Sequence, residues 1–105
     1  MLTLPIKKKW FDMIATGQKK EEYRNRTKYY ETRFINLVPI NSTDSIPKYV
    51  IRYRAGYNPD SPLIECIISI TEGIGRKEWG AEEGEIYYVQ KIWDATVLKN
   101  KMPVF

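Results

Sequence analysis

A short segment near the N-terminus concentrates side chains that can do acid–base or recognition chemistry. Its sequence is Gly17-Gln18-Lys19-Lys20-Glu21-Glu22-Tyr23-Arg24. If the segment is extended, alternate residues share a face, so Glu22 and Arg24 point the same way. Lys19 joins them only if the chain turns at Gly17. A lysine beside carboxylates in a partly dry cleft can act as an acid, a base or a nucleophile.

The same side chains can instead bind a nucleotide. Carboxylates accept hydrogen bonds from the exocyclic amines of bases, and lysine or arginine binds phosphate. A distant carboxylate, Glu65, lies in an apolar run, where it is costly unless it is paired or near the wet end of a strand. It can pair with Lys19 or Arg24. A structural ion pair and a functional carboxylate both fit, and the sequence leaves the two open.

Composition excludes several classes of site. The chain has 105 residues, no histidine and one cysteine, Cys66. Without histidine, Ser-His and Cys-His mechanisms are excluded, and a zinc site with a single cysteine is not expected. We therefore expect no cofactor and no metal. Cys66 is predicted to be a small buried apolar residue that forms no disulfide within the chain.

Length and charge indicate one basic domain over residues 1–105. The net charge is +4, and basic residues outnumber acidic ones nine to four within residues 1–40. A basic half beside a near-neutral half favours an anionic partner, although a merely soluble basic surface fits as well. No apolar run approaches 18 residues, so we expect no membrane span and a cytoplasmic protein.

The N-terminal half contains elements that can position the charged segment. Ile6, Trp10 and Met13 recur at helical spacing, which predicts an amphipathic helix ended by Gly17. Thr27 is a candidate cap for a second helix. In chain order the predicted elements are a strand over 2–4, a helix over 6–16, a strand over 19–24, a helix over 28–33, an ambiguous segment over 34–38 and a loop over 39–47.

The C-terminal half is predicted to be mostly β-structure. Its elements are a strand over 48–54, a loop over 55–62, a strand over 63–70, a bulge or bend over 71–75, a glycine-flanked loop over 76–84, a strand over 85–93, a turn at Asp94 and a short strand over 95–98. Tyr57 lies in a loop beside Arg52 and Arg54, which makes it a candidate ligand contact. Packing of Tyr57 against its own loop is the alternative.

These elements predict an α+β fold. Strands at irregular spacing, with no repeated helix between them, argue against a parallel βαβ arrangement. A small, mostly antiparallel β-barrel of about five to six strands, with one to three flanking helices, fits best.

Four positions of the charged segment, Gly17, Lys19, Glu22 and Arg24, match the pattern G-x-K-x-x-E-x-R. This pattern is the signature of ASCH domains, which belong to the PUA-like superfamily. The surrounding order is also similar, including a Trp-Phe helix before the motif and the later sequences Glu78-Trp79-Gly80-Ala81 and Tyr87-Tyr88-Val89. Over nearly its whole length the chain resembles small bacterial and phage ASCH proteins. The resemblance implies a PUA-like pseudobarrel with a cleft lined by the four motif residues.

The resemblance also implies RNA binding or RNA processing. One branch of the superfamily removes the acetyl group of N4-acetylcytidine with a lysine, a threonine and a glutamate. Lys19 matches the lysine, and Glu65 matches the glutamate in a similar strand context. Glu22 stands at the threonine position, where a carboxylate cannot supply a hydroxyl nucleophile. A metal-dependent ribonuclease is a further idea for the family, in which Glu22 and Glu65 can hold a divalent ion.

We therefore predict an RNA- or nucleotide-binding module. Its predicted contact residues are Gly17, Lys19, Glu22, Arg24, Arg52, Arg54 and Tyr57. The alternative is a small hydrolase acting on a modified nucleoside or on RNA, with Lys19, Glu22 and Glu65 as catalytic residues. A third reading is a buried ion pair at Glu22 without a ligand, which predicts no open pocket at the motif.

Overall fold

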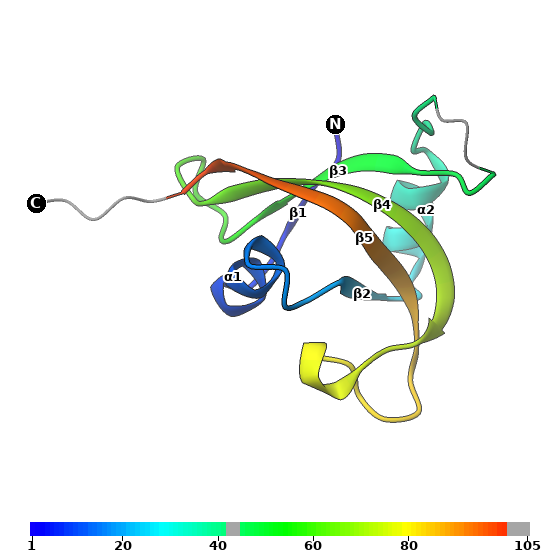
Figure 1. Cartoon of the computed structure of the whole chain (residues 1–105). Coiled ribbons are helices and arrows are strands. Elements are labelled where there is room, and N and C mark those ends of the chain that lie inside the picture. Colours follow the sequence, from blue (N-terminus) through cyan, green and yellow to red (C-terminus); the bar gives the residue numbers. More distant parts are fainter. Residues whose placement is uncertain (42–44, 101–105) are drawn as a thin grey trace, which may run out of the picture.

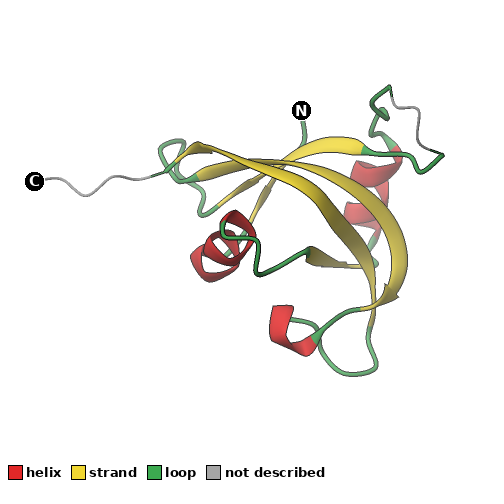
Figure 2. Cartoon of the chain, in the orientation of Figure 1, coloured by secondary structure: helices red, strands yellow, loops and turns green. Residues whose placement is uncertain are grey.

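The computed structural model describes residues 1–41 and 45–100. Within these ranges the chain forms one sheet of five strands, two α-helices and one turn of 3-10 helix (Figures 1 and 2). The elements are β1 (Thr3–Pro5), α1 (Lys8–Ala15), β2 (Glu21–Asn25), α2 (Lys28–Ile35), β3 (Tyr49–Arg54), β4 (Leu63–Ile74), the 3-10 helix (Lys77–Trp79) and β5 (Ile86–Lys99). Residues 42–44 of the predicted loop and residues 101–105 lie outside the described part.

The sheet has the order β1-β3-β4-β5-β2. Strand β1 runs parallel to β3, and the other three pairings are antiparallel. Figure 1 shows β4 and β5 arching together across the molecule, with α1 and β2 beneath the arch. The result is a curled half-barrel, which confirms the predicted α+β, mostly antiparallel, barrel-like fold.

Alternation along the central strands builds the main core. Ile51 and Tyr53 of β3 and Ile64, Cys66 and Ile68 of β4 are buried on the concave face. Cys66 is therefore the buried apolar residue that its sequence context predicts, and burial raises the pKa of its thiol to about 12.

Both α-helices pack on this core. Phe11 and Ile14 of α1 and Phe34 of α2 belong to the same buried cluster. The predicted cap of α2 is confirmed, because Thr27 Oγ1 accepts a hydrogen bond from the Tyr30 amide at 3.4 Å. Helix α2 ends at Ile35, so the ambiguous segment begins as helix and continues as loop.

A second, smaller apolar cluster lies on the other face of β2 and β5. It consists of Tyr23, Tyr87, Val89 and Ala81, with Trp79 packed against them. Ala81 and Trp79 belong to the connection between β4 and β5, so this connection folds back over the sheet. The position of Trp79 bears directly on the motif, as described below.

Neither of the long C-terminal strands ends where the sequence predicts. Strand β4 continues to Ile74 without a bulge over residues 71–74, because Thr71 to Ile74 stay in register with β5. The chain also does not turn at Asp94. Ile67 is opposite Asp94 and Ile68 is opposite Ile92, so Trp93 is one extra residue. A β-bulge accommodates such a residue without ending the strand.

Candidate functional site

The charged segment begins with the turn that the sequence requires. Gly17 has a φ of 81°, in the left-handed region that favours glycine after a helix. The amide of Lys19 then donates to the carbonyl of Met13 at 2.9 Å, which folds the chain back under α1. This turn brings Lys19 to the same side as Glu22, with Lys19 Nζ 3.8 Å from Glu22 Oε2. The predicted convergence of these two residues is confirmed.

Lys19 is almost completely enclosed, with 1% of its surface exposed. Its ammonium group donates to the carbonyl oxygen of Trp79 and lies 4.2 Å from the ring centroid of Trp10. Burial lowers the pKa of Lys19, Arg24 lowers it further, and Glu22 partly opposes both effects. Desolvation outweighs the single carboxylate because few polar groups replace the lost water.

The loop that covers Lys19 fits because of a glycine. Gly80 has a φ of 100° and follows Trp79, whose carbonyl meets the lysine. A Cβ atom at Gly80 would lie 2.9 Å from Trp10 Cζ2. Only a residue without a side chain allows the loop to approach the indole this closely.

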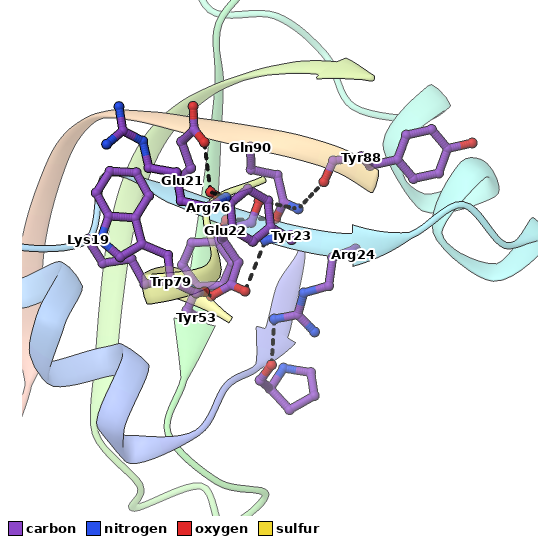
Figure 3. A network of polar contacts seen from close by, with 11 residues as sticks. Lys19, Glu21, Glu22, Tyr23, Arg24, Tyr53, Arg76, Trp79, Tyr88 and Gln90 are labelled. Carbon is purple, nitrogen blue, oxygen red and sulfur yellow. Dashed lines mark hydrogen bonds and ion pairs between the residues drawn. The ribbon is translucent and has the colours of Figure 1, made fainter. Parts of the chain in front are cut away.

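Glu22 is held on the core side of β2, with 8% of its side chain exposed (Figure 3). Its Oε1 atom accepts from the amide of Tyr23 at 3.0 Å. Its Oε2 atom is buried and, within the described residues, has no hydrogen-bond donor. A buried carboxylate oxygen without a donor is uncommon and calls for an explanation.

A buried chain of hydrogen bonds holds the backbone at Glu22 in place. Tyr53 donates to Gln90 Oε1 at 2.7 Å, and Gln90 Nε2 lies 3.3 Å from the backbone carbonyl of Glu22 (Figure 3). Burial and the charge of Glu22 raise the pKa of Tyr53 well above its ordinary value. Tyr53 therefore keeps its proton and acts as a donor, which fixes this part of β2 against β5.

Arg24 extends from the same side of β2 as Glu22 (Figure 3). One Nη atom donates to the Pro5 carbonyl at 2.7 Å, and the other donates to the Tyr30 hydroxyl at 3.2 Å. The Nε atom is buried and makes no hydrogen bond to any described residue. No ion pair joins Arg24 to a carboxylate in the described ranges, so its charge is not neutralised by direct contact.

An open hollow of about 300 Å³ lies at Arg24. Its lining comprises Pro5, Ile6, Lys7, Arg24, Tyr30, Gly56 and Tyr57. Tyr57 stands at this hollow with 89% of its surface exposed, so it does not pack against its own loop. The structure thus brings together two predicted contact residues, Arg24 and Tyr57, that lie 33 positions apart in the sequence.

Glu65 does not join this group, and its predicted pairing with Lys19 or Arg24 is wrong. Glu65 Oε1 lies 3.2 Å from Nε of Arg52, its cross-strand neighbour. Both side chains lie on the outer face, because Ile51, Tyr53, Ile64 and Cys66 occupy the core face. The set of Lys19, Glu22 and Glu65 is therefore divided between the two faces of the sheet.

The remaining predicted arginine, Arg54, shares the outer face with Arg52 by alternation along β3. Its Nε atom is buried and has no hydrogen-bond partner among the described residues. Arg52 and Arg54 thus stand apart from the motif. The four motif residues do not line one cleft: Arg24 lines the hollow described above, whereas Gly17 and Lys19 line another hollow of about 320 Å³.

Several residues of the site carry no recognisable signal in the sequence. Trp79 and Pro5 contribute backbone carbonyls, which any residue type can supply. Lys7 belongs to a lysine triplet that resembles an ordinary solvated helix face. Gln90 is the one that sequence could have shown, since it is an uncharged polar residue placed between apolar positions of a strand.

The fold and this cluster define a small α+β protein whose polar residues gather where β2 meets α1 and β1. No family model, curated protein or solved structure matches the chain. Within the described residues no three acidic or cysteine side chains are grouped so as to hold a metal ion. The helices of the same part of the chain are too short and too polar to cross a membrane.

Proposed function

We propose that the chain is an RNA- or nucleotide-binding module of the ASCH type, with the hollow at Arg24 as its ligand site. The observation that carries this proposal is the state of Arg24. Its guanidinium group is fixed by Pro5 and Tyr30, lines an open hollow and has no carboxylate partner among the described residues. A pre-oriented arginine of this kind suits a phosphate group.

Local charge supports an anionic ligand. Lys19 and Arg24 are two cations beside the single carboxylate of Glu22, and Lys7 adds a third cation at the hollow. An excess of positive charge in a partly buried site favours an anion more strongly than the same charges in water. The resemblance to ASCH domains adds the expectation that the anion belongs to RNA or to a nucleotide.

The aromatic wall supports a ligand that also carries a base. Tyr57 is exposed at the hollow, and Tyr30 is held in place by stacking on Phe34 with ring centroids 6.0 Å apart. Aromatic side chains of this kind stack on bases without regard to sequence. We assign the phosphate to Arg24 and Lys7, and the base to Tyr57.

The test is a titration of the protein with fluorescently labelled nucleotides and short RNA at low salt. Arg24→Gln should weaken binding by about 10- to 100-fold, because a charge-assisted hydrogen bond is lost. Arg26→Gln is the matched control, since Arg26 is an exposed arginine that pairs with Glu72 at 3.8 Å. Affinity should fall as salt rises. Absence of binding at low salt, or equal loss in both variants, would contradict the proposal.

The hydrolase alternative rests on the lowered pKa of Lys19. A lysine of this kind is a candidate general base or nucleophile. However, Lys19 is enclosed by Trp10 and Trp79, and Glu65 lies on the other face of the sheet. A screen of acylated nucleosides and RNA, with and without a divalent metal, tests this alternative. Product that disappears in Lys19→Ala would replace the binding-only proposal.

A further inference from the structure

An exposed tryptophan stands on the outer face of the sheet, apart from the hollow at Arg24. Trp93 is the extra residue of the bulge in β5, between Ile92 opposite Ile68 and Asp94 opposite Ile67. Bulges redirect side chains, and here the indole is 41% exposed. Such a large aromatic ring at the surface is not needed by either apolar cluster.

The ring is nevertheless held in a fixed position. Its Nε1 atom donates to Ser69 Oγ at 2.9 Å, and Ser69 is buried. A tyrosine or tryptophan that is hydrogen-bonded at one edge presents the rest of its ring at little cost in conformational entropy. The bulge and Ser69 together therefore present the indole as a rigid platform.

Two ammonium groups lie over this ring as cation–π contacts. Lys48 Nζ is 4.3 Å and Lys91 Nζ is 4.2 Å from the ring centroid. Lys91 is opposite Ser69 in the ladder, and on its other side it is opposite Glu21. The carboxylate of Glu21 accepts a hydrogen bond from the Tyr23 hydroxyl at 2.8 Å, so it is engaged elsewhere.

This surface is distinct from the hollow at Arg24. Along β5, Gln90 points to the core side and contacts Glu22, so Lys91 points to the outer side. A separate hollow of about 320 Å³ adjoins the platform, and its lining includes Trp93, Asp94, Gly17 and Lys20. There is thus room beside the ring, and a third lysine lies at that hollow.

We propose that Trp93, Lys48 and Lys91 form a second contact site, which stacks an unpaired base of a single-stranded nucleic acid. The base stacks on the face of the indole where an ammonium group lies in the free protein, and the displaced lysine side chains contact the adjacent phosphates. An exposed ring flanked by cations is the arrangement that binds single strands without sequence preference. The inference rests on the proposed function for the class of ligand, but it uses different residues on a different face.

The experiment is a fluorescence anisotropy titration with labelled oligouridine RNA and oligothymidine DNA of matched length. Trp93→Ala should weaken binding by about 5- to 100-fold, while Trp93→Phe keeps most of the affinity. The double variant Lys48→Ala/Lys91→Ala should reduce the slope of log affinity against log salt by about one. Val97→Ala is the matched control, because Val97 is an apolar residue of the same strand with the same exposure.

Folding of each variant is checked by its urea midpoint. The Phe and lysine variants keep the test decisive if Trp93→Ala is unstable. Loss of affinity for RNA alone, or for both oligonucleotides, supports the site and shows whether the site requires RNA. Unchanged affinity in Trp93→Ala and in the lysine variant overturns it. The proposal is also overturned if the protein binds anionic phospholipid vesicles in a Trp93-dependent way but does not bind oligonucleotides.

Failure of this proposal and failure of the proposed function give different results. If Arg24→Gln loses affinity and Trp93→Ala does not, the hollow is the only site and the platform is wrong. If Trp93→Ala loses affinity and Arg24→Gln does not, the platform binds and the hollow was assigned wrongly. No binding of either oligonucleotide at low salt overturns both.

Discussion

Two carboxylates on opposite faces of the same sheet are held in opposite ways. Glu22 is buried on the core side, 3.8 Å from the ammonium group of Lys19, with one oxygen that lacks a donor among the described residues. Glu65 is half-exposed on the outer face, 3.2 Å from Nε of Arg52. Glu65 therefore has a close cationic partner in a solvent-exposed position, whereas Glu22 has a more distant cationic partner in a buried one.

The difference separates a structural charge pair from a candidate functional one. An exposed pair contributes about 0–1 kcal/mol, and its presence needs no further explanation. Taking charges out of water costs several kcal/mol per ion, and only excellent geometry compensates for it. The geometry at Glu22 is not excellent, because Oε2 is not hydrogen-bonded and Lys19 has a lowered pKa. Stability alone therefore does not account for the Glu22 cluster, which is why we propose a functional role for the motif.

The largest expected effect comes from removing the buried carboxylate. Glu22→Ala leaves Lys19 as an uncompensated buried cation, so the free energy of unfolding should fall by about 3–5 kcal/mol. Glu65→Ala should lower it by no more than about 1 kcal/mol. Urea denaturation of both variants at neutral pH measures the two values. Equal small losses would remove the contrast between the two faces.

The next largest effect is recovery of stability when both buried charges are removed together. The double variant Lys19→Met/Glu22→Gln has no buried charge at this position, and its unfolding free energy should lie within about 1 kcal/mol of that of the parent protein. Each single variant should be less stable than the double one. If the two single losses simply add, the charges stabilise the fold and the cluster is a structural pair.

Local features of the site could be predicted from the sequence, and long-range ones could not. The turn at Gly17 and the alternation of Glu22 with Arg24 depend on neighbouring residues, so they follow from the chain itself. The partner of Glu65 depends on the register between β3 and β4, which an eight-residue loop sets. Local sequence does not determine that register, so it does not indicate Arg52 as the partner of Glu65.

Backbone contacts limited the prediction in a second way. The carbonyls of Trp79 and Pro5 hold Lys19 and Arg24, but their positions depend on the fold of distant segments. The predicted turn at Asp94 failed for a related reason. A polar residue after an apolar run favours a turn locally, yet pairing with β4 keeps the strand going through a bulge at Trp93.

A smaller effect is expected from pH. Burial lowers the pKa of Lys19 in the folded protein below its ordinary value of 10.5. At pH values between the lowered pKa and 10.5, the unfolded chain therefore binds more protons than the folded one. Stability contributed through Lys19 therefore rises with pH in that window. The difference in unfolding free energy between the parent protein and Lys19→Met should increase as the pH rises toward 10.5, the ordinary pKa of lysine.

Comparing the parent protein with Lys19→Met also cancels most of the pH dependence that comes from other titrating residues. Burial raises the pKa values of Tyr23, Tyr53 and Cys66, which makes stability fall as pH rises through their ordinary range. These residues are present in both proteins, so their contributions largely cancel. The difference between the parent protein and Arg52→Ala should stay flat with pH. A flat Lys19 difference would mean that Lys19 is not desolvated in solution.

The smallest expected effects belong to the outer pair, and they test the comparison most directly. Arg52→Gln and Glu65→Gln should each change the unfolding free energy by less than about 1 kcal/mol, and salt should reduce the change further. Neither substitution should alter nucleotide binding at the hollow at Arg24, because both side chains lie on the other face of the sheet. Urea midpoints at two salt concentrations, together with the nucleotide titration, check both statements. If Glu65→Gln abolishes nucleotide binding or turnover while the unfolding free energy changes by less than about 1 kcal/mol, the loss does not come from unfolding. Glu65 must then be counted with the functional carboxylates, and the contrast between the two faces of the sheet is wrong.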